Sequence, residues 1–458
     1  MPATIEPERI KLLNDRAMAA NGDFVLYWMQ QSQREAHNPA LEYSVGIANS
    51  LGLPVIVVFV LMEDYPEANE RHFAFMLQGL EEVARGLKRR RIPLLVRGGD
   101  PQEVVVELAH KAAALVCDRG YLRHQRDWRE LVSRLVGCQV IQVEGDVVVP
   151  VDLVSDHVEY AARTIRPKIL RLRDDFLRPV ARARLRKPMW PCKLAGDFDP
   201  ANADKLLATL EIDRSVPRVA RFKGGTTQAR KHVNRFSKRG LVDYAEARND
   251  PAEPRCSTLS PYLHFGQISP VEVARKVAAT ESCSQADREA FLEQLIVRRE
   301  LSINYVLHEP RFDSYSAIPE WAKRTLHEHR GDQRPYRYTR SQLEAASTHD
   351  PYWNAAMLEM LKTGYMHNYM RMYWGKKIIE WSSSPQQAFR IIINLNNKYF
   401  IDGRDPNSYT SVAWLFGLHD RPWTERAEFG KIRYMNAGGL ERKFDIQRYV
   451  RWAGELVS

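Results

Sequence analysis

The sequence has no long apolar run, and this absence bears on where the protein works. No stretch of about 18 uncharged apolar residues is present, and the best candidate segment, Pro54–Met62, fits a buried strand rather than a membrane span. The N-terminal residues also lack the charged-then-apolar pattern of a secretory signal peptide. We therefore expect a cytoplasmic protein without membrane association.

The sequence also lacks the cysteine and glycine patterns that mark several common sites. Its five cysteines are scattered, odd in number and never spaced as Cys-x-x-Cys, so we expect neither a disulfide framework nor a metal site. A P-loop and a GxGxxG dinucleotide fingerprint are absent as well. Neither nucleotide-binding motif therefore marks a site in this chain.

Positive charge and tryptophan are what the sequence has in excess. The formal net charge is +10, and because a basic surface commonly neutralises phosphates, nucleic acid is the leading candidate partner. Charge alone is weak evidence, since many basic proteins bind no nucleic acid. Six of the ten tryptophans fall at or after Trp353, which directs attention to the C-terminal part of the chain.

Between Asp23 and Pro150, short β-branched runs alternate with amphipathic stretches. Strands separated by helices indicate βαβ units and a doubly wound, Rossmann-like parallel sheet. The expected strands are Phe24–Trp28, Val55–Val60, Pro93–Val96, Ala114–Cys117 and Val140–Val143, and the expected helices include Arg71–Lys88 and Gln102–Ala113.

The rest of the chain changes character twice. Residues 151–215 are rich in arginine and are interrupted by Pro167, Pro179 and Pro188, which indicates a partly helical linker. Its charges serve either a solvated face or phosphate contact. After residue 216, β-branched runs become scarce and helical periodicity dominates. We therefore predict an N-terminal extension (1–22), an α/β domain (23–150), a basic linker (151–215) and an all-α domain (216–458).

A helix expected over Met366–Trp381 carries two tryptophans on one face. Trp374 and Trp381 lie two turns apart, about 10.5 Å along the axis by helical rise. That separation suits a chain of redox-active indoles that passes electrons between a buried cofactor and the surface. The alternative is a plain aromatic core stripe.

Polar residues on the same helix favour a ligand site. Asn368 and Arg371 lie toward a different side, and such groups are costly to bury unless they serve a partner. A polar loop follows the next helix, and it places Asp402 where it could pair with Arg371. A solvent-exposed turn is the alternative reading of that loop.

A third group of residues suits contact with nucleic acid. Trp414 and Trp423 flank a short Gly- and Pro-containing loop, and Arg421 and Arg433 lie nearby in the sequence. Aromatic rings interleaved with arginines fit stacking on bases combined with cationic contact to phosphates. Each tryptophan taken singly is more often a core residue.

Three segments carry a resemblance to a known family. Ser260–Ser269 (SPYLHFGQIS), Gly364–Trp374 (GYMHNYMRMYW) and Asp402–Asn407 (DGRDPN) closely resemble those of class II cyclobutane pyrimidine dimer DNA photolyases. The similarity covers nearly the whole chain. It implies an antenna-type α/β domain, a linker and a helical domain that binds FAD in a U shape.

The resemblance also implies an activity. It is a carbon–carbon lyase reaction that repairs pyrimidine dimers in UV-damaged duplex DNA by electron transfer from photoexcited, reduced FAD to a flipped-out dimer. A second, antenna chromophore such as a deazaflavin is a further possibility. We expect the protein to act as a monomer.

Matching by motif assigns roles to individual residues. For the cofactor, the residues resembling phosphate-binding elements are Tyr244, Ser257, Thr258, Leu259 and Ser260, and those resembling the flavin surroundings are Arg298, Asn368, Arg371, Asp402 and Gly403. Asn396 resembles the asparagine that faces flavin N5. The electron-supplying residues, in order from the flavin, are Trp374, Trp353 and Trp381. On the substrate side, Met372, Trp414 and Trp423 resemble the dimer pocket, and Arg421 and Arg433 resemble residues that fill the gap left by the flipped lesion.

The sequence departs from the family at one position. The family has a carboxylate directly before the Leu-Ile pair that is Leu295-Ile296 here, and it can hydrogen-bond the dimer. This chain has Gln294 there, with Glu293 one residue earlier. Neighbouring helix residues point about 100° apart, so Glu293 cannot replace it. We expect slower repair, unless the match is shifted by one residue.

Two related functions compete with dimer repair. A cryptochrome-like flavoprotein photoreceptor would share the cofactor, but the chain ends at Ser458 with no signalling tail. A (6-4) photolyase needs a histidine acid at the lesion, and His367 lies in a pattern shared with dimer photolyases, which favours a structural role. A purely structural DNA-binding protein would not explain Asn396 together with Arg371 and Asp402.

Overall fold

A six-stranded sheet forms the N-terminal part of the structure, a computed structural model that describes residues 5–189, 193–253 and 255–456. The strand order is β1-β6-β5-β2-β3-β4, with β1 antiparallel to its neighbour and the remaining pairs parallel. The strands are β1 (Ile10–Leu12), β2 (Phe24–Trp28), β3 (Val55–Leu61), β4 (Leu94–Gly98), β5 (Ala112–Asp118) and β6 (Gln139–Val143), and the covering helices are α1 (Pro39–Leu51), α2 (Glu70–Arg89), α3 (Pro101–Ala109) and α4 (Arg123–Leu135).

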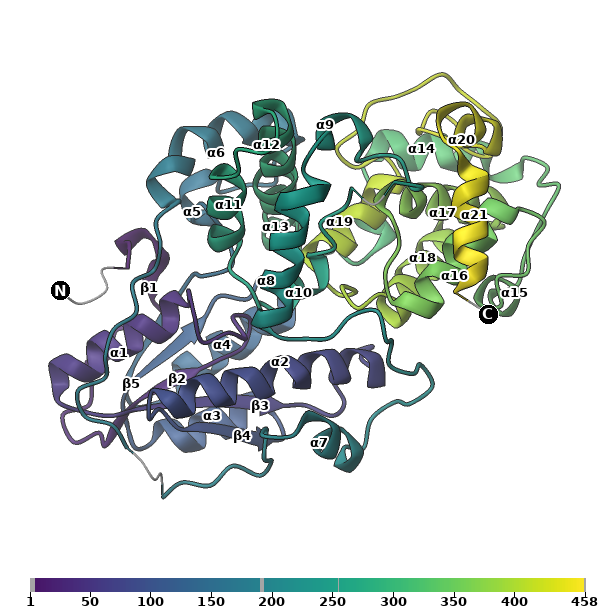
Figure 1. Ribbon diagram of the computed structural model, residues 1–458. Helices are drawn as coiled ribbons and strands as arrows, with labels where there is room; N and C mark the ends of the chain where they lie inside the picture. Colours follow the sequence, from purple (N-terminus) through teal and green to yellow (C-terminus); the bar gives the residue numbers. More distant parts are fainter. Residues whose placement is uncertain (1–4, 190–192, 254, 457–458) are drawn as a thin grey trace.

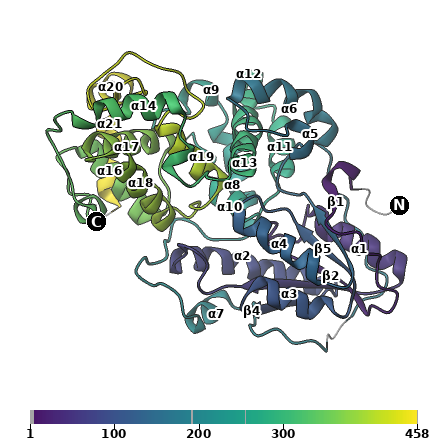
Figure 2. The ribbon, with the colours of Figure 1, turned by 180° about the vertical axis from the view of Figure 1, so that it is seen from behind.

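Alternating side chains along the strands build two apolar layers. In β2, Val25 and Tyr27 pack with α1 and α2, whereas Phe24, Leu26 and Trp28 pack with α3 and α4. All five side chains are buried, as expected for a parallel strand covered on both faces. Figure 1 shows α1 and α2 in front of the sheet, and Figure 2 shows α3 and α4 on the opposite face.

The predicted doubly wound sheet is confirmed, with changes at its edges. The prediction of a helix through Ala113 is wrong, because α3 ends at Ala109 and β5 already begins at Ala112. Residues of the expected N-terminal extension supply β1, in which Ile10 lies opposite Val143 of β6. A three-residue strand is too short to show a period of two in the sequence.

The basic segment 151–215 is not one exposed tether. Helix α5 (Val151–Val154) contributes Val154, and α6 (Ala162–Phe176) contributes Ile165 and Ile169, to a core shared with the helical part of the chain, whereas α7 (Ala203–Thr209) packs on α2. The prediction that Pro167 interrupts this segment is wrong, since Pro167 lies inside α6. Burial of the isoleucines on either side offsets the hydrogen bond that a proline removes.

The C-terminal part is helical, as predicted. In the described residues after 216, the β structure consists of one isolated bridge between Arg426 and Gly430. Within the described residues, no helix has the length and apolar character needed to span a membrane. The elements are α8 (Thr226–Arg235), η2 (Phe236–Gly240), α9 (Tyr244–Ala247), α10 (Ser260–His264), α11 (Pro270–Ala278), α12 (Gln285–Leu292), η3 (Glu293–Arg298), α13 (Arg299–His308), η4 (Tyr315–Ala317), α14 (Glu320–Glu328), η5 (His329–Gly331), α15 (Arg340–Glu344), α16 (Pro351–Thr363), α17 (Asn368–Trp381), α18 (Pro385–Tyr399), α19 (Pro406–Leu415), α20 (Ala437–Lys443) and α21 (Ile446–Glu455).

Arg71 of α2 joins the α/β part to the helical part. Its guanidinium donates hydrogen bonds to the carbonyl oxygens of Met360 (3.1 Å), Leu361 (2.7 Å) and Tyr399 (2.6 Å). These carbonyls lie in the last turns of α16 and α18. The last carbonyl groups of a helix lack an N–H donor within the helix, and the helix dipole favours a cation there. Burial lowers the pKa of Arg71 to about 10, so this link stays charged at neutral pH.

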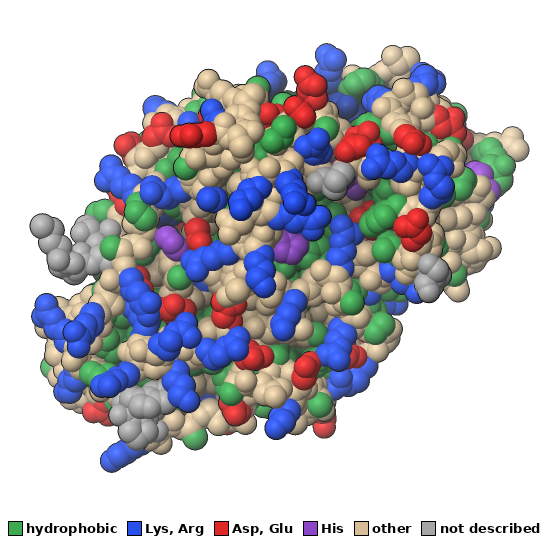
Figure 3. Space-filling view, viewed as in Figure 1, with side chains coloured by type: hydrophobic (Ala, Val, Ile, Leu, Met, Phe, Trp, Pro, Cys, Tyr) green, Lys and Arg blue, Asp and Glu red, His purple; other side chains and the backbone are tan. Residues whose placement is uncertain are grey.

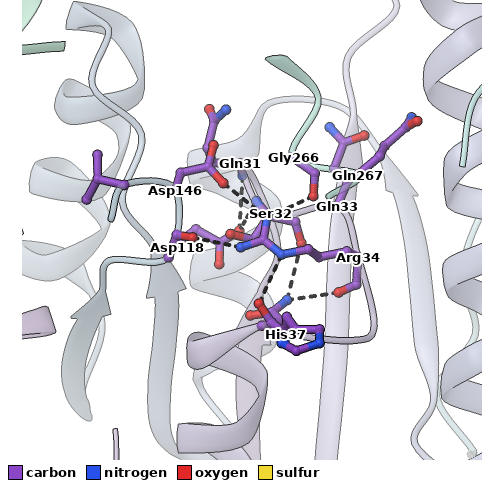
Figure 4. Close-up of polar contacts among 12 residues, drawn as sticks. Gln31, Ser32, Gln33, Arg34, His37, Asp118, Asp146, Gly266 and Gln267 are labelled. Carbon is purple, nitrogen blue, oxygen red and sulfur yellow. Dashed lines mark hydrogen bonds and ion pairs between the residues drawn. The ribbon is translucent and has the colours of Figure 1, made fainter. Parts of the chain in front are cut away.

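A second buried arginine, Arg34, holds the loop after β2 against both parts of the chain (Figure 4). Its guanidinium donates to Asp146 Oδ1 (3.0 Å), to the Gly145 carbonyl (2.8 Å) and to the Gly266 carbonyl (2.9 Å). Gly266 belongs to the helical part and has a φ of 60°, and a Cβ there would lie 1.8 Å from the Gln31 carbonyl oxygen. Only glycine allows this approach.

Asp118, at the end of β5, holds the same loop from a second side. One carboxylate oxygen accepts the backbone N–H groups of Gln30 (2.9 Å), Gln31 (3.0 Å) and Ser32 (2.8 Å), and the other accepts the Tyr27 hydroxyl (2.6 Å). The loop therefore lies fixed at the carboxyl end of β2, beside the β2–β5 pair where the strand order reverses. Ligands of open α/β sheets bind at that point.

We expect Arg34→Met to destabilise the protein strongly. The substitution leaves Asp146, whose side chain is 2% exposed, without this partner, and breaking one side of a buried ion pair costs about 3–5 kcal/mol. Urea unfolding followed by circular dichroism measures the loss. Arg182→Met is the matched control, because the Arg182 side chain is 60% exposed and should change stability by less than about 0.5 kcal/mol. Equal stability of the two variants would contradict this role of Arg34.

Candidate functional site

A cavity lies in the helical part where α10, η3, α17, α18 and α19 meet, and we call it the central cavity. It collects residues that the sequence places far apart. The predicted site residues that line it are Tyr244, Ser257, Thr258, Leu259, Ser260, Gln294, Asn368, Arg371, Met372, Trp374, Asn396 and Asp402. Those that lie outside its wall are Trp353, Trp381, Arg298, Gly403, Trp414, Trp423, Arg421 and Arg433.

Arg371 and Asp402 form an ion pair at the cavity wall, as the sequence predicts. Arg371 Nη2 lies 3.1 Å from both carboxylate oxygens of Asp402, and the guanidinium lies 3.9 Å from the centre of the Phe400 ring. The side chains are only 18% and 7% exposed. Because a largely buried charge is costly without a partner, each residue keeps the other ionised at a fixed place in the wall.

Asn396 projects into the cavity from α18 and is held by its neighbour. It is 6% exposed, and its Nδ2 donates to Asn397 Oδ1 at 3.0 Å. Gly403 does not line the cavity, and its effect is on the backbone. A Cβ at Gly403 would lie 2.9 Å from the Asn396 carbonyl oxygen and 3.0 Å from that of Phe400, so the absence of a side chain lets the Asp402 loop fold back against α18.

The turn before α10 carries backbone strain. Thr258 has a φ of 54°, a left-handed conformation that is unusual for a β-branched residue. Its hydroxyl lies 2.7 Å from His232 Nδ1, and burial lowers the pKa of His232, so the ring is neutral at neutral pH. Strain of this kind collects at binding sites, which supports the predicted role of this turn as a ligand wall.

A π-helical turn, η3, brings a different arginine to the central cavity from the one that the sequence predicts. Gln294 lines the cavity, while Glu293 points outward to Arg166 (2.7 Å) and Arg298 (3.2 Å). The predicted placement of Arg298 at the cavity is wrong, and Arg299 lines it instead. In an α-helix the residue four positions after Gln294 would share its face, whereas the wider π turn brings the fifth residue there. The periodicity of the sequence does not show that this turn contains one residue more than an α-helical turn.

The three predicted tryptophans form a continuous buried stack. The ring centres of Trp374 and Trp353 lie 6.4 Å apart with planes at 11°, and those of Trp353 and Trp381 lie 5.5 Å apart at 65°. Trp353 comes from α16 and inserts between the two residues of α17, and its Nε1 donates to the Trp374 carbonyl at 3.0 Å. Trp374 alone of the three lines the central cavity, so the stack leads away from it.

The outer end of this stack differs from the prediction. Trp381 was expected toward the surface, but it is only 3% exposed. Its ring contacts Tyr338 (4.9 Å) and His349 (5.6 Å), and Tyr336 stacks on His349 at 3.6 Å with 47% exposure. The helix α17 also starts at Asn368 rather than Met366, because His367 accepts the Tyr369 N–H as an N-terminal cap.

The remaining aromatic and arginine residues form a cluster of their own, here called the Trp423 cluster (Trp414, Asp420, Arg421, Trp423 and Arg433). Arg433 lies 4.2 Å from the Trp423 ring and 5.4 Å from the Trp414 ring, and Arg421 lies 5.7 Å from Trp423. Asp420 orders the cluster, accepting from Arg433 Nε (3.0 Å) and Trp423 Nε1 (3.2 Å). The sequence predicted the rings and arginines but not this aspartate.

A buried lysine beneath the cluster was also missed. Lys376 is fully buried, its Nζ lies 5.8 Å from the Trp414 ring, and it donates to the Leu415 carbonyl at 2.5 Å. Burial lowers its pKa to about 7. Leu415 is the last residue of α19, where a cation is favoured. A lysine two positions after a tryptophan gives no signal of this in the sequence.

Comparison with known proteins agrees with this geometry. Residues 25–187 match the sequence profile of DNA photolyase. Over 97% of its length the chain is 46% identical to the deoxyribodipyrimidine photo-lyase of Methanothermobacter thermautotrophicus, 98% of which is covered. The chain belongs to the DNA photolyase family. The Arabidopsis thaliana photolyase of the same name is 39% identical, with 99% of this chain and 94% of that protein covered.

A solved photolyase shows the same fold at low identity. The archaeal photolyase structure from Sulfolobus tokodaii, described with two FAD molecules, superposes with a TM-score of 0.68 at 18% identity, covering 93% of this chain and 89% of that one. At this identity the likeness bears on the fold alone. It agrees with the predicted fold class, an α/β domain followed by a helical domain.

This photolyase-family chain has a second cavity, in the α/β domain at the carboxyl ends of β2 and β3. Trp28, Phe59, Tyr65 and Trp128 contribute aromatic walls, and the loop after β2 contributes Gln30, Gln31 and Gln33. Both amide atoms of Gln30 and the amide oxygen of Gln33 are buried without a hydrogen-bond partner. Buried polar groups are normally satisfied, so these atoms are suited to bind a polar ring.

A hydrogen bond connects the two cavities. His264 lines the second cavity and Asp405 lines the central one, and His264 Nδ1 lies 3.1 Å from Asp405 Oδ2. Asp405 also caps α19 by accepting the Asn407 N–H at 2.8 Å. The two ligand-sized spaces of this photolyase-family fold therefore share a wall of paired polar residues.

Proposed function

We propose that this protein is a light-driven DNA-repair enzyme, a deoxyribodipyrimidine photo-lyase of class II that splits cyclobutane pyrimidine dimers with FAD as cofactor. One observation supports it above the others. The central cavity brings together an ion pair that can hold a heteroaromatic ring, a buried tryptophan stack that begins at its wall, and Gln294 from a third element.

The residues at the central cavity fit FAD. Trp374 Nε1 is buried without a hydrogen-bond partner at its wall, and the Arg371–Asp402 pair offers both a donor and an acceptor to the flavin ring. Tyr244 and the Ser257–Ser260 turn would hold the pyrophosphate. Asn396 would present its amide to the flavin, and an amide can both donate and accept as protonation changes.

Bound FAD in its reduced state supplies the chemistry, giving one electron to the dimer under light and taking it back once the ring has split. The chain's own residues would hold FAD in place and bind the dimer. Gln294 and Met372 line the cavity at the substrate side, where Gln294 can donate and accept hydrogen bonds with the pyrimidine carbonyls and N–H groups. Trp381, Trp353 and Trp374 would form a path along which electrons from an external reductant could reach oxidised FAD.

The Trp423 cluster supports binding of damaged duplex DNA. Its arginines can contact phosphates or enter the gap left by a flipped dimer, and its tryptophans can stack on bases. Figure 3 shows lysine and arginine side chains over both domains on one face of the molecule, so charge alone does not locate the DNA. The Trp423 cluster and the central cavity support a DNA site beside them, because they combine charge with stacking and a recess.

The alternative of (6-4) repair lacks its histidine acid. None of the described residues that line the central cavity is a histidine. His367 caps α17 and its Nε2 lies 3.2 Å from the Arg248 carbonyl. Burial lowers its pKa to about 4, so it is neutral at physiological pH. These contacts support the structural role expected for His367.

We also propose that the second cavity binds a light-harvesting chromophore. Its aromatic walls and the unpaired amides of Gln30 and Gln33 suit a flavin or deazaflavin ring. The Sulfolobus structure with two FAD molecules offers a precedent in a protein of the same fold. Further parts of the proposal are a monomer acting in the cytoplasm without membrane contact, and domain limits near residues 150 and 215, with the residues of β1 counted in the α/β domain.

The function is tested by purifying the protein, recording its absorption spectrum and incubating it with dimer-containing DNA in light and in darkness. We expect a yellow or blue flavoprotein and loss of dimers only in light, measured by chromatography of hydrolysed DNA. A colourless protein, or repair that is indifferent to light, would refute the proposal.

We expect Gln294 to control dimer binding. Gln294→Ala removes a hydrogen-bonding side chain worth about 1 kcal/mol, which lowers affinity for dimer-containing DNA about fivefold. Gln294→Glu restores the carboxylate of related enzymes and should raise the number of dimers split per absorbed photon. Gln285→Ala is the matched control, because Gln285 is exposed in the first turn of α12 and does not line the central cavity. An effect of Gln285→Ala as large as that of Gln294→Ala would contradict this role of Gln294.

A further inference from the structure

The basic segment that the sequence singles out divides into paired and unpaired arginines. In α6, Arg166 pairs with Glu293 at 2.7 Å and Arg173 pairs with Glu289 at 3.1 Å. These charges are used in packing α6 against the helical domain. Arg163, in the first turn of α6, instead places its guanidinium 5.4 Å from the centre of the Tyr160 ring.

Tyr160 itself is exposed, which is unusual for so large a ring in this protein. In the described part of the chain, three large aromatic side chains are exposed to solvent. They are Tyr160 (55% exposed), Tyr336 (47%) and Trp423 (39%). Tyr336 is stacked on His349 at 3.6 Å. The other two lie at one place, because both bond to Asp420.

Asp420 connects these two rings. Its carboxylate accepts Trp423 Nε1 at 3.2 Å and Arg433 Nε at 3.0 Å, while its carbonyl accepts the Tyr160 hydroxyl at 3.4 Å. An exposed ring with an arginine over it therefore occurs twice around a single aspartate, once in the Trp423 cluster and once at the start of α6. The second unit plays no part in the hydrophobic core.

Further cations surround the same place. Arg166 and Arg298 share Glu293, and Glu293 directly precedes Gln294 of the central cavity. Their side chains remain 37% and 50% exposed. Through the hydrogen bond of Tyr160 to Asp420, the start of α6 adjoins the Trp423 cluster, which is proposed to bind DNA.

We infer that Tyr160 and Arg163 form a second DNA-contacting unit, in which the Tyr160 ring stacks on an unstacked nucleobase next to the flipped dimer and Arg163 contacts the adjoining phosphate. Rings stack on any base, and a neighbouring arginine adds charge without sequence preference. Flipping a dimer leaves neighbouring bases without stacking partners, which is the ligand this unit suits. The inference rests on the proposed function.

Binding of a fluorescently labelled duplex with one cyclobutane dimer, measured by anisotropy with the full-length protein in the dark, tests it. Tyr160→Ala should weaken binding about tenfold, within the range found when one stacking ring is removed, whereas Tyr160→Phe should bind within about twofold because the ring remains. Arg163→Ala should weaken binding and reduce the slope of log K against log salt by about 1.

Two matched controls share the chemistry but not the place. Tyr336→Ala removes an exposed ring elsewhere, and Arg171→Ala removes an exposed arginine farther along α6; both should bind the duplex like the unsubstituted protein. Bound FAD and the melting temperature, measured on each variant, exclude a folding defect.

The inference is overturned if Tyr160→Ala binds like the unsubstituted protein, or if Tyr160→Phe loses as much as Tyr160→Ala. The second result would mean that the hydroxyl bond to Asp420 matters and the ring does not. Failure of the proposed function would look different, since the unsubstituted protein would then leave dimers intact in light.

Discussion

Trp374→Phe is expected to abolish the light-driven reduction of bound, oxidised FAD. Trp374 is the member of the stack that lines the central cavity, and Trp353 and Trp381 reach the cavity only through it. Phenylalanine keeps the aromatic packing but is far harder to oxidise than an indole. Illumination in the presence of a thiol, followed by flavin absorbance, measures the rate.

The design of this experiment separates electron supply from repair. Enzyme reduced chemically beforehand should still split dimers when Trp374 is replaced, because the stack serves FAD reduction. Trp353→Phe should impair photoreduction as well, and the double variant should be no worse than Trp374→Phe, as expected for steps in series. Trp452→Phe is the control, since Trp452 packs against the same core outside the stack. Photoreduction at the original rate in Trp374→Phe would contradict the electron path.

Asp402→Asn is expected to lower both the amount of bound FAD and the free energy of unfolding. The substitution keeps the side-chain shape but leaves Arg371 largely buried without its carboxylate, 3.1 Å away. Loss of one partner of a buried pair costs about 3–5 kcal/mol, and the same guanidinium is proposed to face the flavin. We expect purified Asp402→Asn to contain little FAD and to unfold at a lower urea concentration.

The matched control for Asp402 is an exposed pair of the same chemistry. Asp204 lies 2.6 Å from Arg218, with side chains 75% and 56% exposed, and exposed pairs contribute about 0–1 kcal/mol. Asp204→Asn should therefore leave FAD content and the urea midpoint nearly unchanged. If Asp402→Asn retains full FAD, the Arg371–Asp402 pair is not part of the flavin site.

Periodicity and turn chemistry predicted much of the fold. The β2 limits and the α/β alternation follow from β-branched runs separated by amphipathic stretches, because a doubly covered parallel sheet needs continuous apolar strands. Strand β1 and the path of α6 could not be predicted in this way. Their placement depends on tertiary contacts, such as Ile10 against Val143 and the burial of Ile165 beside Pro167.

The candidate site also has parts that the sequence predicts and parts that depend on tertiary contacts. The Arg371–Asp402 pair follows from charged side chains that are costly to bury without a partner, whereas the order of the tryptophan stack follows from the resemblance to the photolyase family. The exchange of Arg298 for Arg299 follows from neither, because one π turn shifts the face of a helix without any mark in the sequence. Lys376 was not predicted because its neighbours Trp414 and Leu415 lie far along the chain. Asp420 was not predicted because its sequence context does not show that its carboxylate pairs with Trp423 and Arg433.

An action spectrum tests the central claim most directly. Dimer splitting by the reduced protein is measured per incident photon across the near-ultraviolet and blue, first with bound FAD, then after FAD removal, and again after FAD is restored. We predict that the rate follows absorption by bound chromophores, vanishes without FAD and returns when FAD is added back. Repair that persists in FAD-free protein, or that proceeds equally in darkness, would contradict the assignment of the central cavity to a flavin-driven DNA-repair reaction.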